Sequence, residues 1–170
     1  MIEIYTDGAC TGNGSENARG AWAFVAVVCG QLACNRVGVL GPEHKPHTNN
    51  KAELMAAKLA MDWMSERIEA GEPPHPFKIV SDSRYLVDGM NKWTQSWRKR
   101  GWRGKKRPEI KNLEIWQALR AQADKLPVVF AWVRGHNGNR WNERADELAE
   151  DAAANFPLDL DFNTAKVPAS

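Results

Sequence analysis

The pattern of apolar and polar positions predicts three strands in the first forty residues. Ile2 and Ile4 alternate with more polar neighbours, which is typical of a strand with two unlike faces. Residues 21–30, AWAFVAVVCG, and residues 32–40, LACNRVGVL, predict two further strands separated by a short connection that contains glycine. The start of the chain is therefore expected to form an antiparallel hairpin or meander.

The rest of the chain alternates helical and extended patterns. Residues 49–70 are rich in helix formers with apolar residues at helical spacing, and Thr48 or Asn49 can cap this helix. A proline-bearing connection leads into FKIVSDS, a short strand, and a helix is expected from about Ser83. Three more elements follow: an amphipathic helix at 108–126, a strand buried on both faces at 127–135, and a helix at 139–156.

This order of elements predicts an α/β fold with one five-stranded mixed sheet. The three N-terminal strands would be antiparallel, and the two later strands would be parallel and joined by crossovers, with helices covering the sheet. At 170 residues the chain is long enough to bury a full core. We expect one domain over residues 1–155 and a mobile tail at 156–170.

Composition excludes some classes of protein. No run of about 18 apolar residues is present, so no membrane span is expected, and no secretory signal is visible at the N-terminus. Cys10, Cys29 and Cys34 lack CxxC spacing, which indicates free thiols in a reducing compartment and argues against a zinc site. The expected location is the cytoplasm.

The charge is concentrated in one segment. The stretch RKRGWRGKKR, residues 98–107, holds seven basic residues and no acidic residue, and without these seven charges the net charge of +2 would become −5. A mildly acidic body with a single cationic segment indicates a binding surface for a polyanion.

Four acids stand at positions suited to a shared site. Asp7 is expected to end the first strand and Asp82 the fourth, while Glu53 lies early in the long helix and Asp146 lies in the last helix. Parallel neighbouring strands would bring Asp7 and Asp82 to the same end of the sheet, where ligands gather in such folds. Each acid alone has an ordinary alternative, a turn residue or a solvated helix side chain.

Clustered carboxylates predict a bound cation. They repel one another, and some would hold protons unless a cation neutralised them. Ligation by oxygen alone favours Mg²⁺, with Mn²⁺ as a substitute. Two such ions can activate a water molecule and stabilise the leaving oxygen of a phosphodiester.

Four blocks, YTDGAC, TNNKAEL, SDSRYL and VRGHNGNRWNERADELA, together resemble the signature blocks of ribonuclease H, type 1, in its bacterial form. WTQSWRKRGW and NLEIWQAL also resemble that family's basic handle, here residues 92–112. The resemblance implies the ribonuclease H-like fold. It also implies an endonuclease that cuts the RNA strand of RNA–DNA hybrids with two Mg²⁺ ions, leaving 5′-phosphate and 3′-hydroxyl ends.

The resemblance also assigns roles to the acids. Asp7 would bridge both ions, and Glu53, Asp82 and Asp146 would be the other metal ligands. His136 resembles the family's mobile histidine, which assists water activation or product release. Its ordinary alternative is to shape the RGHNG loop.

Substrate contacts follow from the same blocks. The side chains expected to contact the two strands are Asn13, Thr48, Asn49 and Asn50, followed in the handle by Trp93, Arg98, Lys99, Arg100, Lys105 and Lys106. The TNN sequence can also serve as a helix cap. Trp93 and Trp97, four residues apart, can instead pack the handle against the body, and Trp116 is expected in the core.

Two departures bear on specificity. The loop GNGSENARGAW is longer than usual for the family and lacks its proline, and Arg84 stands where bacterial members usually have glutamine. Two other functions stay open: a hybrid-binding module without catalysis, and a resolvase or transposase of the same superfamily. We expect a monomer with no obligate protein partner.

Overall fold

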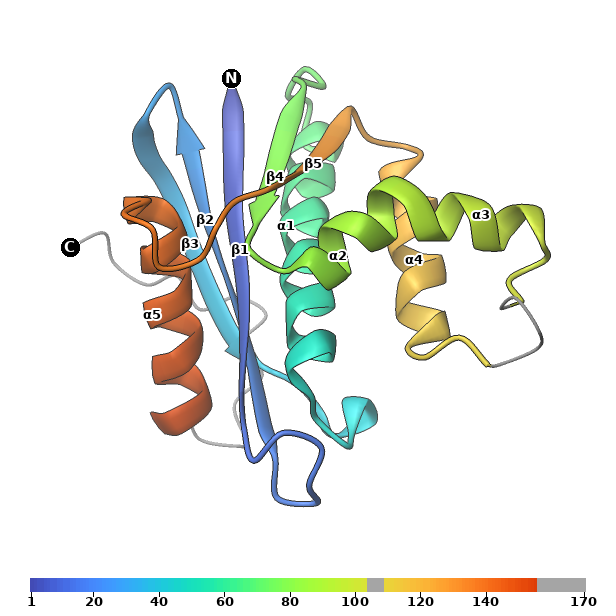
Figure 1. Ribbon diagram of the computed structural model, residues 1–170. Coiled ribbons are helices and arrows are strands. Elements are labelled where there is room, and N and C mark those ends of the chain that lie inside the picture. Colours follow the sequence, from blue (N-terminus) through green and yellow to red (C-terminus); the bar gives the residue numbers. More distant parts are fainter. Residues whose placement is uncertain (104–108, 156–170) are drawn as a thin grey trace.

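The computed structural model describes residues 1–103 and 109–155 and contains a five-stranded sheet with helices on both faces (Figure 1). The strands are β1 (Ile2–Thr11), β2 (Arg19–Val28), β3 (Gln31–Val39), β4 (Phe77–Ser81) and β5 (Val128–Trp132). Their order is β3-β2-β1-β4-β5. The first three are antiparallel, whereas β4 pairs in parallel with both β1 and β5. The predicted mixed sheet is confirmed.

Helices cover each face of the sheet. The helical elements are η1 (Pro42–His44), α1 (Asn49–Glu69), α2 (Arg84–Asp88), the π-helix η2 (Gly89–Trp93), α3 (Thr94–Lys99), α4 (Leu113–Ala123) and α5 (Arg140–Asn155). One core lies between the sheet, α1 and α4, and a second lies between the sheet and α5 (Figure 1). Within the described ranges, no helix combines the length and apolar character needed to cross a membrane.

The β2–β3 connection is the predicted hairpin. Cys29 and Gly30 form its tip, with φ angles of 51° and 79°. Left-handed φ at both central residues is typical of a type I′ turn, whose twist matches that of the strands it joins. The local sequence was therefore sufficient to predict this pairing.

Helix α1 begins where its cap was expected. Thr48 has extended backbone angles, and its Oγ1 accepts a hydrogen bond of 3.1 Å from the backbone N–H of Lys51. The buried side of the helix carries Ala52, Leu54, Ala57 and other small or apolar residues against the sheet. Both the cap and the apolar spacing of this helix are confirmed.

Two expected boundaries are wrong. Strand β1 does not end at Asp7 but continues to Thr11, because its antiparallel pairing with β2 extends beyond the end of β4. Helix α4 begins at Leu113, since Asn112 just before it adopts a left-handed φ of 58°. Asp7 thus lies within a strand, two residues past the last β1–β4 pair, Tyr5 with Val80.

Strand β5 is also not buried on both faces as expected. It is an edge strand with one neighbour, β4, and Val129 is 59% exposed while Trp132 is 39% exposed. Its run of apolar residues is typical of a buried strand, but the sheet order places no described strand on its other side. Trp132 is consequently accessible next to the end of β4.

The handle is anchored by an aromatic cluster. Trp93 and Trp97 have ring centroids 6.0 Å apart, and both pack on Trp116, which is fully buried. The Tyr85 hydroxyl accepts hydrogen bonds from Trp116 Nε1 and Asn112 Nδ2. The packing role of the tryptophans is confirmed. The expected tail at 156–170 lies outside the described residues.

Candidate active site

Three carboxylates from separate elements lie together at the end of β4. Asp7 is in β1, Glu53 is in α1, and Asp82 follows the last residue of β4. One oxygen from each carboxylate lies within 4.8 Å of the other two. We call these three side chains the acid cluster. The structure thus brings together three of the four acids that the sequence selected.

Gly8 allows this approach. A Cβ atom at Gly8 would lie 2.4 Å from the carbonyl carbon of Ala52 and 2.4 Å from the backbone nitrogen of Glu53, far inside van der Waals contact. Only glycine lets β1 and α1 come so near. The backbone N–H of Gly8 also donates a 2.8 Å hydrogen bond to Asp7 Oδ1. The Asp-Gly pair therefore places Asp7 beside Glu53 and is not a turn.

Asp146 and His136 flank the acid cluster. Asp146, on α5, is close enough for its charge to act on both Asp7 and Asp82. His136 lies on the loop before α5 with a φ of 52°, and its side chain is 78% exposed. Its Nδ1 is 4.0 Å from Asp146 Oδ2. Asp146, the fourth acid selected from the sequence, is thus outside the acid cluster but near it, and the exposed imidazole of His136 lies beside it.

The acid cluster is electrostatically strained. Burial raises the pKa of Asp7 to about 8, and the charges of Asp82 and Asp146 act in the same direction. Burial, followed by the charge of Asp7, raises the pKa of Glu53 well above its usual range. Asp7 Oδ2 and Glu53 Oε2 are buried without a hydrogen-bond partner among the described residues. These oxygens fit a divalent cation, which would relieve the repulsion.

This strain predicts how stability depends on pH and metal. The pKa of Asp7 is about 8 in the folded state, against 3.8 ordinarily. Below pH 3.8 the carboxyl is protonated in both the folded and the unfolded state, so it does not lower the free energy of unfolding. Stability is lost as the pH rises from there towards 8. In EDTA, the melting temperature of wild type should fall between pH 5 and pH 8 by ~5 °C more than that of Asp7→Asn. Differential scanning fluorimetry measures this difference.

Mg²⁺ provides the second half of that test. Because it binds the ionised carboxylates, saturating Mg²⁺ should restore most of the lost melting temperature at pH 8 in wild type and little in Asp7→Asn. Identical pH profiles for the two proteins in EDTA would contradict the electrostatic account.

Asp82 is surrounded by residues that orient it. A Cβ at Gly135 would lie 2.7 Å from Asp82 Oδ2, so the loop after β5 passes directly over the carboxylate. Asn142 is 1% exposed, and its Nδ2 donates a 3.5 Å hydrogen bond to Asp82 Oδ2. Sequence reasoning missed Asn142. Its spacing of four residues from Asp146 places both on one face of α5 and could have indicated it.

A polar groove runs between the start of α1 and the handle. It has a volume of about 1110 Å³, and six of the residues expected to contact substrate line it: Asn13, Thr48, Asn49, Asn50, Trp93 and Arg100. Asn13 Oδ1 accepts a 2.8 Å hydrogen bond from the backbone N–H of Asn49, which ties the loop after β1 to the helix. Lys92, Ser96 and Lys111 also line the groove and were not selected from the sequence.

The remaining handle cations are placed differently. Arg98 forms an ion pair with Asp124, which follows α4, and is not among the groove-lining residues. Lys99 is exposed and also lies outside the groove lining. Lys105 and Lys106 lie outside the described residues. Of the handle cations selected from the sequence, Arg100 is thus the one that the described structure directs to the groove.

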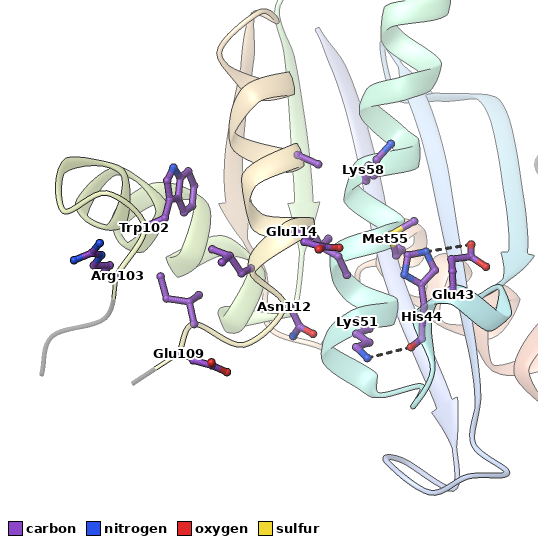
Figure 2. A pocket seen from close by; sticks show the side chains of 14 residues that line it. Glu43, His44, Lys51, Met55, Lys58, Trp102, Arg103, Glu109, Asn112 and Glu114 are labelled. Carbon is purple, nitrogen blue, oxygen red and sulfur yellow. Dashed lines mark hydrogen bonds and ion pairs between the residues drawn. The ribbon is translucent and has the colours of Figure 1, made fainter. Parts of the chain in front are cut away.

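A second cavity, of about 1200 Å³, lies between η1, α1 and α4 (Figure 2). Neither its lining nor that of the groove includes any of the four acids, and the two share Lys51, Glu109, Ile110 and Asn112. Figure 2 shows that some of its polar residues already contact one another. Lys51 Nζ donates to the backbone oxygen of His44, and His44 Nε2 lies 3.5 Å from Glu43 Oε1. The groove, which holds the residues selected from the sequence, is therefore the better candidate for a substrate site.

Comparison with known proteins agrees with this arrangement. The RNase H family model matches residues 1–154. The ribonuclease H of Pseudomonas paraeruginosa is 38% identical over 157 residues, covering 92% of this chain and 96% of that protein. Ribonuclease HI of Pseudomonas aeruginosa is 37% identical with the same coverage. These relatives define an enzyme of the endoribonuclease class.

Solved structures show the same fold. The crystal structure of LC9-RNase H1, a type 1 RNase H with the type 2 active-site motif, is 31% identical with a TM-score of 0.71. It covers 90% of this chain and 72% of that one. The RNase H domain of PFV, 22% identical with a TM-score of 0.73, covers 90% of this chain and 94% of that one and shares the fold. The chain belongs to the ribonuclease H family.

Proposed function

We propose that this protein hydrolyses the RNA strand of RNA–DNA hybrids, using two Mg²⁺ ions that Mn²⁺ can replace, and leaves 5′-phosphate and 3′-hydroxyl ends. The observation that carries the proposal is the acid cluster beside the polar groove. Asn50 and Glu53 are one turn apart on α1, and Tyr85 of the groove is three residues from Asp82. The groove and the acid cluster are therefore neighbours, and a hybrid lying along the groove would place a phosphodiester at the carboxylates.

The chain supplies the ligands for the ions. Asp7, Glu53, Asp82 and Asp146 would hold them, and the unpaired buried oxygens of Asp7 and Glu53 fit that task. When bound, divalent ions activate water and stabilise the leaving oxygen. Asn142 and the backbone around Gly135 keep the Asp82 carboxylate oriented, and burial of Asp7 excludes bulk water from its side of the site.

The groove suits a hybrid. A hybrid differs from DNA by one strand of 2′-hydroxyls, and the short amides of Asn13, Asn49 and Asn50 can both donate to and accept from sugars. Lys92, Arg100 and Lys111 add positive charge for phosphates. Binding should therefore weaken steeply with salt and carry little sequence information. We further propose a cytoplasmic monomer that acts without a protein partner.

The test is cleavage of three uniformly labelled duplexes in Mg²⁺: an RNA–DNA hybrid, an all-DNA duplex and an all-RNA duplex. The proposal predicts cutting of the hybrid alone, with excess substrate consumed by trace enzyme and 5′-phosphate on the products. Equal cutting of the three duplexes, or tight hybrid binding without turnover, would reject it.

His136→Ala is expected to slow turnover by ~10- to 100-fold without eliminating it. The imidazole is exposed and 4.0 Å from Asp146, so it can exchange protons with solvent, but it is not part of the acid cluster. Single-turnover cleavage and product release should be measured separately, beside His75→Ala, a histidine in the connection before β4. Complete loss of cleavage with Mg²⁺ binding unchanged would contradict this prediction and show that the reaction requires His136.

A further inference from the structure

Arg84 stacks on an exposed indole at the edge of the active site. It is the first residue of α2, two positions after Asp82, and its side chain is exposed. Its guanidinium carbon lies 3.9 Å from the centroid of the Trp132 ring. Among residues 1–103 and 109–155, no carboxylate forms an ion pair with it. Within those ranges, a cation two residues from Asp82 is therefore held on an indole without an acidic partner of its own.

The platform under Arg84 is tied to the acid cluster. Trp132 is the last residue of β5, and its Nε1 donates a 3.0 Å hydrogen bond to the backbone oxygen of Asp82. Ser83 caps α2 by accepting a hydrogen bond from the backbone N–H of Leu86, which fixes the backbone that carries Arg84. The guanidinium is thus linked to the Asp82 backbone in two ways: through the chain by way of Ser83, and through the indole on which it stacks.

Stacking leaves the binding edge of a guanidinium free. The attraction to the ring uses the face of the planar group, so its in-plane N–H donors remain available. That fork matches two oxygens of a phosphate. The indole also reduces the freedom that the long side chain would lose on binding. Arg84 is therefore prepared to bind a phosphate.

We propose that Arg84, held on Trp132, binds a phosphate of the cleaved RNA strand immediately beside the scissile one. This deepens the proposed function and rests on it. The scissile phosphate must lie at the acid cluster, and its neighbours in the same strand are one nucleotide away, at the edge where Arg84 stands. The groove lined by Asn13, Trp93 and Arg100 is on the α1 side and does not include Arg84, so it serves other parts of the hybrid.

The first test is kinetic. Arg84→Gln should raise KM for the hybrid about fivefold at ~0.1 M salt with kcat within about twofold, because a contact made equally before and during the reaction affects binding alone. The slope of log KM against log salt should decrease by about 0.9, the value of one phosphate contact. Arg84→Lys should recover only part of the affinity, since it lacks the planar fork. Arg67→Gln removes a similar Arg–Trp stack at the other end of α1 and should change neither quantity.

The second test locates the phosphate. Hybrids with a single cleavable site would carry one neutral methylphosphonate at each phosphate flanking the cut in the RNA strand, one position at a time. At one of these positions Arg84→Gln should no longer raise KM. If the effect persists at every RNA-strand position, or vanishes only when a DNA-strand phosphate is neutral, the inference is overturned. Unchanged KM in Arg84→Gln, with normal wild-type cleavage, also overturns it and leaves the proposed function intact.

Discussion

Asp7→Asn is expected to reduce hybrid cleavage to below roughly a thousandth of the wild-type rate while hybrid binding changes little. Asp7 contributes an oxygen to the acid cluster, and an amide cannot replace its charge as a metal ligand. The surfaces that we propose to hold substrate, the groove and the handle, are untouched. Binding is measured by fluorescence anisotropy with a labelled hybrid, and cleavage is measured by gel at saturating Mg²⁺.

The control for this variant is Asp151→Asn, an exposed acid on α5 away from the cluster, which should cleave at the wild-type rate. Asp7→Asn should also melt at a higher temperature than wild type in EDTA at pH 8, because it removes a buried charge with a raised pKa. Loss of cleavage together with a lower melting temperature would indicate misfolding and contradict the assigned role.

Gly8→Ala is expected to damage the fold and the site together. The added methyl would lie 2.4 Å from the α1 backbone, so β1 and α1 must separate and Glu53 must move away from Asp7. The expected loss of stability is roughly 3 kcal/mol, with cleavage reduced by at least ~100-fold. Urea unfolding and the hybrid assay measure the two effects on the same preparation.

Gly71→Ala is the matched control. Gly71 has a φ of 98°, but a methyl group added there would meet no neighbouring atom of the described chain within 4 Å. Only backbone strain of about 1 kcal/mol is therefore expected, with cleavage unchanged. If Gly8→Ala were as stable and active as Gly71→Ala, the close approach of β1 and α1 would not be what assembles the site.

Local patterns were sufficient for much of the fold. The first strand, the short glycine connection between β2 and β3, and the cap at Thr48 depend on a few neighbouring residues, and the structure contains each of them. The expected two unlike faces of β1 are wrong, because this central strand packs on a core at each face and Ile4, Tyr5, Thr6 and Asp7 are all buried. The order of strands and helices then leaves few ways to form one mixed sheet. Asp82 could be selected because it follows a strand end, and Glu53 because it lies early in a helix, whereas Asp7 was selected at a strand end that the structure places at Thr11.

The missed features depend on contacts distant in sequence. Asp7 lies within β1 because the pairing of β1 with β2 continues beyond the last pair of β1 with β4. The local sequence of β1 does not indicate how long its partner strands are. The apolar run of β5 predicts burial, yet its place at the sheet edge exposes Trp132. The hydrogen bond of Asn142 to Asp82 joins residues sixty positions apart. Pattern and spacing carry no information on such pairs.

The most direct measurement is a Mg²⁺ titration of hybrid cleavage for wild type and for each amide variant of Asp7, Glu53, Asp82 and Asp146. Wild type should reach a plateau, whereas the three variants of the acid cluster should stay near background at the Mg²⁺ concentration that saturates wild type, and the Asp146 variant should be severely impaired. Wild-type cleavage curves from any two of the cluster variants would contradict the claim that these carboxylates jointly hold the catalytic ions.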